Sequence, residues 1–347
     1  MGSWTQLLGP LMRHEPVPVE LVQWGMREVM SAAATPSQIA AFAVAMRMHG
    51  ETAEEIAALV EVMLEFSERL HYDGVALDTC GTGGDGAHTV NISTMAALLL
   101  SAAGVAIVKH GGRAASSKCG SADVLEELGL RINITPEQAQ QSLDQLGAVF
   151  CFAPTFHPAL RFAGPTRREI GVPTIFNILG PLANPAQPRA QIVGVPDAQR
   201  AALVAEALRL RGTSALVVRG DDGLDELSIF VPSTVWSTWM EAPVRLDPQQ
   251  LGIPKYAADS LLGGDAAFNA DVARRVLAGE TTGTLAAVAD AVLLNAAAAM
   301  VAVRAAEGQA ASDLPAAVAV HLATLRPLLA SGAGGRKLDQ WIAFTPR

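Results

Sequence analysis

The sequence predicts an α/β protein with a mainly parallel central sheet, preceded by a small helical unit. From His71 onward, short apolar runs alternate with helical segments, and this alternation is typical of βαβ units. Before His71 the chain shows helix-start signals and no strand pattern. We therefore divide the 347 residues into a helical domain, 1–70, and an α/β domain, 71–347, and expect part of 165–190 to join the helical domain.

Two helix starts in the first domain show the capping-box pattern. The segments Thr35–Gln38 and Thr52–Glu55 each place a threonine three residues before a Gln or Glu, so that each side chain can cap the other's backbone. Pro36 fits the first helical position of the first of these helices. We expect that helix to end at Gly50 and the second to run to about Leu70.

The α/β domain has a recognisable order of elements. The predicted strands are Val75–Leu77, Val105–Val108, Ala148–Ala153, Ile192–Val195 and Ala215–Val218. The predicted helices are Ser93–Gly104, Val124–Leu128, Thr135–Gly147, Ala198–Leu210 and most of 263–331. The segment Gly171–Pro188 is rich in Pro, Gly and Asn, and we interpret it as a crossing or hinge.

The composition predicts a chain with a large core and makes nucleic-acid binding an unexpected function. Half of the residues are hydrophobic and 17% are charged, which is typical of a chain with a large buried core. The net charge of −9 and the absence of a Lys/Arg stripe make a nucleic-acid partner unexpected. An acidic protein that binds an anion must gather its positive charge locally, so clusters of Lys, Arg and Gly become informative.

Cysteine usage and apolar segments indicate a cytoplasmic protein outside the membrane. Cys80, Cys119 and Cys151 are widely spaced, so we expect neither a disulfide framework nor a zinc site. The first fifteen residues lack the basic and apolar regions of a signal peptide. The apolar stretches Met95–Val108 and Ala291–Val303 look shorter than a bilayer span.

A glycine-rich turn, Gly81–Gly86, follows the first predicted strand and precedes a helix. Glycines let backbone N–H groups approach a ligand closely, and a strand-to-helix turn of this kind is an anion site. A tight turn without a ligand is the plainer interpretation. A dinucleotide fingerprint would need an acid at the end of the second strand, but that strand ends in Lys109-His110 and no acid follows Asp85 before Asp123. A Walker loop is excluded because no Gly-Lys-Ser/Thr follows.

A second loop, Lys109–Ser121, follows the second strand and combines cations, hydroxyls and glycines. Its chemistry comes from Lys109, Gly111, Gly112, Arg113, Ser116, Ser117, Lys118 and Ser121. The carboxyl ends of neighbouring parallel strands meet at one edge of a sheet, so we expect both loops to face one ligand with several phosphates. Between the loops lie Thr89, Asn91, Ser93 and Thr94. Helix capping accounts for one of these side chains, and we expect others to face the ligand.

Carboxylates and arginines elsewhere suggest a metal and a second substrate. Asp225 and Glu226 follow the strand that ends at Val218, and clustered carboxylates at a strand end are ligands suited to Mg²⁺ and substrate phosphates. A polar turn remains the alternative. Arg167 belongs to a group of cations before the Pro/Gly segment, where an arginine can bind a carboxylate or simply lie at the surface.

Taken together, these segments resemble the anthranilate phosphoribosyltransferases of tryptophan biosynthesis. The matching segments keep the family's order and spacing over nearly the whole chain: Asp78–Asp85, Asn91–Thr94, Lys109–Ser117, Gly120–Glu126, Thr174–Pro185 and Gly223–Glu226. The resemblance implies a fold like that of the pyrimidine nucleoside phosphorylases and a homodimer formed through the helical domain. It also implies 5-phosphoribosyl 1-pyrophosphate as donor, an aromatic acid as acceptor and Mg²⁺ as cofactor.

The resemblance also implies a role for individual residues. The donor would contact Gly81, Gly84, Asp85, Thr89, Asn91, Ser93, Thr94, Lys109, Gly111, Arg113, Ser116, Ser117 and Ser121. Magnesium would be held by Ser93, Asp225 and Glu226, and the acceptor would meet Gly81, His110, Gly112 and Arg167. Catalysis would rest on Lys109, Asp225 and Glu226, which neutralise the leaving pyrophosphate directly or through the metal.

One position departs from the family pattern. The family loop reads Lys-His-Gly-Asn-Arg, and its Asn contacts the acceptor, whereas this chain has Gly112. Loss of a group that hydrogen-bonds a substrate can be costly, so an aromatic acid other than anthranilate, joined through nitrogen or carbon, is an alternative. A nucleoside phosphorylase and a non-enzymatic phosphate-ligand sensor are more distant alternatives.

Overall fold

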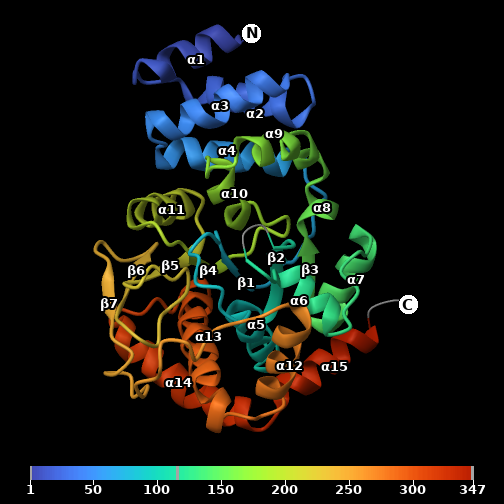
Figure 1. The fold of residues 1–347 in the computed structure, drawn as a ribbon, viewed down its shortest axis with the longest axis vertical. Coiled ribbons are helices and arrows are strands. Elements are labelled where there is room, and N and C mark those ends of the chain that lie inside the picture. Colours follow the sequence, from blue (N-terminus) through green and yellow to red (C-terminus); the bar gives the residue numbers. More distant parts are fainter. Residues whose placement is uncertain (1, 115–116, 345–347) are drawn as a thin grey trace.

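The computed structural model describes residues 2–114 and 117–344. Ser116, a predicted donor-binding residue, lies outside them. A layer of N-terminal helices lies against a larger α/β part (Figure 1). This layer consists of α1 (Trp4–Met12), α2 (Val19–Met30), α3 (Pro36–His49) and α4 (Ala53–Glu65). Both predicted capping boxes are confirmed, at Thr35 and at Thr52.

The described residues form a seven-stranded sheet in the order β3-β2-β1-β4-β5-β6-β7. Its strands are β1 (Ala76–Gly81), β2 (Ala106–Gly111), β3 (Ala148–Phe152), β4 (Ala190–Gly194), β5 (Ser214–Gly220), β6 (Ser233–Ser237) and β7 (Val244–Leu246). The pairs among β1–β5 are parallel, and β6 and β7 are antiparallel. The predicted α/β class with a mainly parallel sheet is confirmed, and the antiparallel edge was not predicted.

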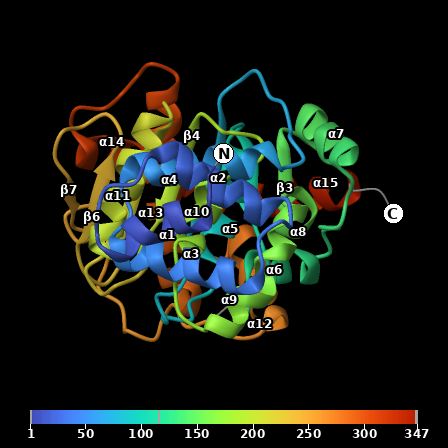
Figure 2. The same ribbon diagram turned by 90° about the horizontal axis from the view of Figure 1, so that it is seen from above.

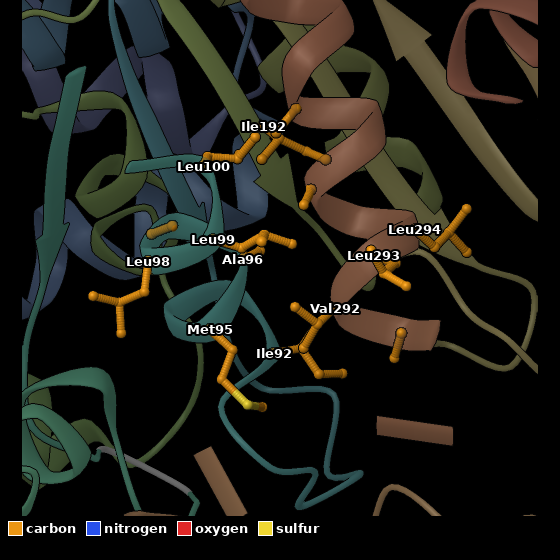
Figure 3. Packing of buried hydrophobic residues seen from close by; sticks show 14 of the residues in the cluster. Ile92, Met95, Ala96, Leu98, Leu99, Leu100, Ile192, Val292, Leu293 and Leu294 are labelled. Atoms are coloured by element: carbon orange, nitrogen blue, oxygen red, sulfur yellow. The ribbon is translucent and has the colours of Figure 1, made fainter. Parts of the chain in front are cut away.

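One face of the sheet is covered by helices from the middle and the end of the chain. These are α5 (Ile92–Ala102), α12 (Ala266–Leu277), α13 (Ala286–Ala306), α14 (Leu314–Ala330) and α15 (Ala333–Phe344). Met95 and Leu99 of α5 pack with Val292 of α13 beside Ile192 of β4 (Figure 3). The smaller helix α6 (Ser121–Glu127) joins the same apolar cluster.

The other face joins the sheet to the N-terminal helices. One apolar cluster runs from α1–α4 through α10 (Phe176–Leu182) and α11 (Ala198–Leu210) to Val193 and Val217 of the sheet. Seen from above, the N-terminal helices lie over α10 and α11 (Figure 2). The helices α7 (Pro136–Leu146) and α8 (Ala153–Phe156), the 3-10 turn Pro158–Phe162 and α9 (Gly164–Ile170) complete this side.

Several predicted boundaries were wrong, for identifiable reasons. The second capped helix ends at Glu65 and not near Leu70. Strand β2 extends to Gly111 because its backbone pairs with β3 as far as Phe152, so Lys109 lies inside the strand. The segment Gly171–Pro188, interpreted as a crossing or hinge, contains the helix α10, which tolerates its glycine and proline while packing against α4.

The helix α13 is longer than the sequence suggested. With the preceding 3-10 turn it spans 24 residues, Gly283–Ala306, which by length alone could cross a bilayer. The prediction that this stretch is too short was therefore wrong. Its most apolar window is 94% buried inside the protein, and a helix that is apolar all round is buried in a core as readily as in a membrane.

The capping box at Thr52 generates a stability prediction. Its hydroxyl accepts a hydrogen bond from Glu55 N at 3.2 Å, and Glu55 Oε2 accepts one from Thr52 N at 2.9 Å. We expect Thr52→Ala to lower the free energy of unfolding by about 1 kcal/mol, measured by urea denaturation. Thr52→Ser keeps the hydroxyl and serves as the control. Equal stability of the alanine variant and the wild type would contradict this role.

Candidate active site

The predicted site residues gather where the central parallel strands end. The turn after β1, the end of β2, the start of α5 and the segment after β5 lie along one edge of the sheet. Connections between parallel strands place their loops at the carboxyl edge, where ligands of open α/β sheets bind. The geometry of each segment shows what this edge can hold.

The glycine-rich turn leaves its backbone open. Gly83, Gly84 and Gly86 have φ of 69°, 87° and 70°, and nothing lies within 4 Å of a Cβ placed on any of them. These conformations favour glycine, and the open space beside Gly84 and Gly86 lets an anion approach their backbone. The turn rests on a distant segment, because Gly263 N donates to His88 O at 2.8 Å and Val90 N donates to Leu261 O at 2.9 Å.

The segment that carries Asp225 and Glu226, which we call the acid pair, passes across the ends of β1 and β4 at very close range. Asp225 Oδ2 accepts a hydrogen bond from Gly83 N at 2.9 Å. A Cβ on Gly81 would overlap the Asp225 carboxylate, and one on Gly194 would overlap the Asp225 carbonyl oxygen. Glycine at both strand ends is therefore a condition for the acid pair to reach the glycine-rich turn.

Burial and the neighbouring carboxylates raise the pKa of both members of this pair. Burial, followed by the neighbouring Asp85, raises the pKa of Asp225 to about 7. Burial, followed by Asp225, raises the pKa of Glu226 to about 8, although Lys109 and a hydrogen bond from the Ser93 backbone oppose this rise. Unbalanced carboxylates in a partly buried setting are stabilised by a cation.

The oxygen ligands at this edge fit a magnesium ion that takes only part of its coordination from the protein. Among the residues that the structure describes, no three His, Cys, Asp or Glu side chains converge as a complete metal site. Mg²⁺ commonly binds one or two protein carboxylates and takes its remaining oxygens from phosphates and water. The pair Asp225 and Glu226, with the Ser93 hydroxyl nearby, fits a metal that arrives with a phosphate ligand.

Lys109 lies beneath this edge and not in a solvent-facing loop. Its side chain is on β2, and the residue is only 2% exposed. The ammonium donates to the carbonyl oxygen of Thr79, to Thr79 Oγ1 at 3.3 Å and to Ser93 Oγ at 3.3 Å. This buried cation connects β1, β2 and the first turn of α5, and it opposes the negative charge of the acid pair.

The polar segment before α5 is held by structural contacts. Asn91 Nδ2 donates to Cys119 O at 3.2 Å, and Asn91 Oδ1 accepts from Asn269 Nδ2 at 2.9 Å. Thr89 forms an isolated bridge with Leu262. Thr94 is buried, and its hydroxyl has no hydrogen-bond partner among the described residues. Because α5 begins at Ile92, Thr89 and Asn91 precede the helix and do not belong to its first turn.

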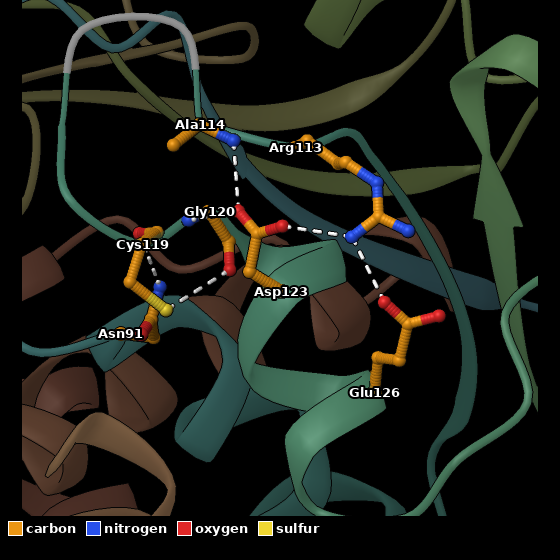
Figure 4. Close-up of polar contacts among 7 residues, drawn as sticks. All are labelled: Asn91, Arg113, Ala114, Cys119, Gly120, Asp123 and Glu126. Atoms are coloured by element: carbon orange, nitrogen blue, oxygen red, sulfur yellow. Dashed lines mark hydrogen bonds and ion pairs between the residues drawn. The ribbon is translucent and has the colours of Figure 1, made fainter. Parts of the chain in front are cut away.

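In the second loop the arginine is engaged within the protein. Arg113 donates to Asp123 at 3.0 Å and to Glu126 at 2.9 Å (Figure 4). Asp123 also accepts from the backbone of Ala114 and of Gly120, each at 2.9 Å. Ser117 is exposed. Ser121 Oγ occupies the space where a Cβ on Gly111 would lie, so this serine faces the end of β2.

The candidate acceptor residues lie on the side of α8–α10. His110 Nδ1 is 3.0 Å from Gly180 O, a carbonyl that requires an N–H donor, and burial lowers the pKa of His110 to about 3, so the ring is neutral. Arg167 is partly buried, its guanidinium lies 5.5 Å from the ring centre of Phe176, and burial lowers its pKa. Within the described residues it has no carboxylate partner, as an arginine that binds an acidic ligand requires.

Comparison with known proteins agrees with this arrangement. The description "Glycosyl transferase family, helical bundle domain" matches residues 5–67, and "Glycosyl transferase family, a/b domain" matches residues 73–326. The anthranilate phosphoribosyltransferase of Rhodococcus jostii is 49% identical over 99% of this chain and 93% of its own. That of Salinispora arenicola is 48% identical over 98% of this chain and 96% of its own.

This chain belongs to the anthranilate phosphoribosyltransferase family. The structure of the family member from Thermus thermophilus has a TM-score of 0.88 and 39% identity, with 97% of this chain and 98% of that one covered. The Saccharomyces cerevisiae enzyme, solved in complex with PRPP and Mg, has a TM-score of 0.87 and 26% identity, with 98% of each chain covered. The chain is therefore a phosphoribosyltransferase, and the alternatives of a nucleoside phosphorylase or a non-enzymatic sensor gain no support.

Sequence reasoning did not identify three residues that shape this phosphoribosyltransferase edge. Gly194 gives room to the acid pair, while Asp78 and Asn184 form a buried contact next to Lys109. A glycine at a strand end is a signal for close backbone approach, so Gly194 could have been found. The contact of Asp78 with Asn184 joins residues 106 apart in the chain, and spacing carries no signal for it.

Gly194 generates the prediction for this site. In Gly194→Ala the new methyl group overlaps the backbone of Asp225, so the acid pair must move away from the turn. We expect phosphoribosyl transfer to fall by about 100-fold or more, because misplacement of a catalytic group by about 1 Å has effects of that size. Steady-state assay of the purified variant measures this.

A matched glycine provides the control for that substitution. Gly9 lies in α1, and a Cβ there meets only the flexible end of Arg13, at 3.4 Å. Gly9→Ala should therefore leave activity unchanged. Equal activity of Gly194→Ala and Gly9→Ala would show that the acid pair does not depend on the close approach.

Proposed function

We propose that this enzyme transfers the phosphoribosyl group from 5-phosphoribosyl 1-pyrophosphate to anthranilate, with Mg²⁺, and releases pyrophosphate. The observation that carries the proposal is the acid pair, which crosses two glycine strand ends and accepts a hydrogen bond from the phosphate-type turn. The relatives named above support anthranilate as acceptor. Support for the ligands comes from the S. cerevisiae enzyme, which was solved with PRPP and Mg and with 4-fluoroanthranilate.

The donor and its metal fit the edge described above. Asp225, Glu226 and Ser93 would hold Mg²⁺, which would supply charge neutralisation for the leaving pyrophosphate. The glycine-rich turn would donate backbone N–H groups to the phosphates, as strand-to-helix turns do. The remaining donor contacts that we propose are those predicted from the sequence: Gly81, Gly84, Asp85, Thr89, Asn91, Thr94, Gly111, Arg113, Ser116, Ser117 and Ser121. Arg113 must exchange its bonds to Asp123 and Glu126 to take part.

The chain's own contribution to the reaction is positioning and electrostatics. The amine nitrogen attacks the anomeric carbon while the bond to pyrophosphate breaks, through a transition state that resembles an oxocarbenium ion. An aromatic amine is already a nucleophile, so no strong general base is required. Lys109, fixed below the edge by Thr79 and Ser93, opposes the charge that develops on the leaving group.

The acceptor would lie between the end of β2 and the helices α8–α10. We propose that Arg167 binds its carboxylate and that His110 and Gly112 line its ring and amine. Gly112 leaves open space, since a Cβ there would meet only Ala153, at 3.9 Å. The expectation of a different acceptor rested on this glycine, and it gains no support from relatives that are all named for anthranilate.

The family resemblance also supports a proposal about the oligomeric state. We propose a homodimer formed through the helical layer, in the cytoplasm. On α1 and α3 the side chains of Met12 and Met48 are 76% and 69% exposed. Both residues lie on the helical layer, so a partner bound there would cover them.

Loss of the buried cation or of an acid should impair turnover. We expect Lys109→Met and Asp225→Asn each to lower kcat by about 100-fold or more, the size of effect seen when one group that stabilises transition-state charge is removed. A coupled assay of pyrophosphate release measures it. Near-normal turnover in either variant would contradict the mechanism.

The acceptor is tested by a panel of aromatic acids incubated with donor and Mg²⁺ and read by mass spectrometry. We expect turnover of anthranilate and little of hydroxybenzoates. Arg167→Gln should raise the KM for anthranilate by about 10- to 100-fold, since a charged hydrogen bond is lost, and leave the KM for the donor unchanged. Arg168→Gln, an exposed neighbour, is the control. Preference for another acid would refute anthranilate as acceptor while leaving the donor proposal intact.

A further inference from the structure

The sheet opens between β1 and β2 at the edge where the active site lies. Backbone pairing of these strands ends at Leu77 and Ile107. By contrast, β1 stays paired with β4 as far as Gly81, and β2 stays paired with β3 as far as Gly111. Backbone pairing between the two central strands therefore stops several residues before the strands end, whereas each strand keeps its backbone pairing with its outer neighbour.

Two buried side chains fill this opening. Asp78 is 0% exposed and Asn184 is 1% exposed. Asn184 Nδ2 donates to Asp78 Oδ2 at 2.8 Å and to Val108 O at 2.6 Å, and Asp78 Oδ1 accepts from His110 N at 3.1 Å. A further bond, from Ala186 N to Asn184 Oδ1 at 2.9 Å, fixes the amide.

These contacts replace the missing part of the sheet ladder. Ile107 N points away from β1, because it donates to Gly147 O before β3. Since alternate residues of a strand point their backbone groups to opposite edges, Val108 O and His110 N face β1. Asp78 and Asn184 therefore satisfy the two β2 groups that the β1 backbone would otherwise satisfy. We call Asp78 and Asn184 the wedge, because these side chains lie between the two strands beyond the point where their backbone pairing ends.

Lys109 lies between the two backbone groups that the wedge holds. Successive side chains of a strand point to opposite faces, so its ammonium emerges on the α5 face, where it reaches Thr79 and Ser93. Asp78 also acts on this lysine through its charge. Burial raises the pKa of Asp78 to about 6, and the positive charge of Lys109 is the largest effect that opposes this rise.

We propose that Asp78 and Asn184 are positioning residues, which hold β1 and β2 apart and thereby fix Lys109 under the leaving pyrophosphate. This inference rests on the proposed function for the identity of the donor. The two residues need not touch the substrate. They act through the backbone on both sides of the lysine.

The chemistry of the pair provides a variant that changes bonding without changing shape. In Asp78→Asn the new amide must direct an N–H group at Asn184 Nδ2 or at His110 N, and both nitrogens are donors that cannot accept it. In the double variant Asp78→Asn/Asn184→Asp an amide again faces a carboxylate, but a carboxylate oxygen now lies where Asn184 Nδ2 donated to Val108 O. Val108 O then has no donor and faces a charged oxygen, so the double exchange should lose at least as much activity as the single exchange.

A buried hydrogen bond elsewhere serves as the control for a merely structural role. Ser142 is buried, and its hydroxyl donates to Ala148 O at 2.7 Å, at the start of β3. Ser142→Ala loses one buried bond that involves neither Lys109 nor its hydrogen-bond partners, so it should lower the melting temperature and leave the kinetics of the folded enzyme unchanged.

Three properties are measured for every variant. Donor binding is measured by calorimetry with 5-phosphoribosyl 1-pyrophosphate and Mg²⁺, and steady-state kinetics and the melting temperature are measured separately. For Asp78→Asn we expect kcat/KM for the donor to fall by about 10- to 100-fold, the range seen when a group that orients a ligand-binding residue is lost, with the KM of the acceptor unchanged. We expect the double exchange to show at least the same loss, because Val108 O loses its donor.

Donor kinetics in Asp78→Asn that match those of Ser142→Ala would overturn the inference, as would a double exchange with the donor kinetics of the wild type. A wild-type enzyme that binds no donor would instead refute the proposed function. The two failures are therefore distinguishable.

Discussion

The segment that carries Asp225 and Glu226 crosses the ends of β1 and β4 so closely that only glycine fits beneath it. The carbonyl of Asp225 lies against Gly194, and its carboxylate lies against Gly81 and accepts from Gly83 N. This contact brings together segments that are 142 residues apart in the chain. The glycine-rich turn, the acid pair and the buried lysine depend on it for their relative positions.

The same contact concentrates charge where water is partly excluded. Asp78 and Glu226 lie near one buried cation, Lys109, and Asp225 and Asp85 lie near Glu226. Burial raises the pKa of Asp225 and of Glu226 because charged forms are disfavoured away from water, and proximity to other carboxylates adds to the rise. A divalent cation bound together with a pyrophosphate would relieve both effects. An acidic protein would in this way bind the highly anionic donor that we propose.

What could be predicted from the sequence was mainly local. The capping boxes at Thr35 and Thr52 depend on side chains three residues apart, and both formed. The glycine-rich turn after β1 was predicted because positive φ and close approach require glycine in any context. Alternating apolar runs and helices gave the fold class. For the individual site residues, resemblance supplied roles that composition and spacing alone did not.

What could not be predicted depends on contacts between distant segments. Lys109 was placed at the end of a strand, but pairing of β2 with β3 draws it into the sheet and buries it. Asn184 belongs to a Pro/Asn-rich stretch that looked like a hinge, and its role depends on reaching Asp78 and Val108. The long acid-bearing segment separates β6 from β5, so no tight-turn signal precedes β6. The antiparallel edge formed by β6 and β7 was therefore not predicted.

The most direct test of the account is a crystal structure of the enzyme grown with 5-phosphoribosyl 1-pyrophosphate and Mn²⁺, with anomalous scattering used to locate the metal. We expect an anomalous peak within coordination distance of the Asp225 or Glu226 carboxylate and of the donor's pyrophosphate, above the glycine-rich turn. A donor and metal bound elsewhere, with no peak at the acid pair, would contradict it.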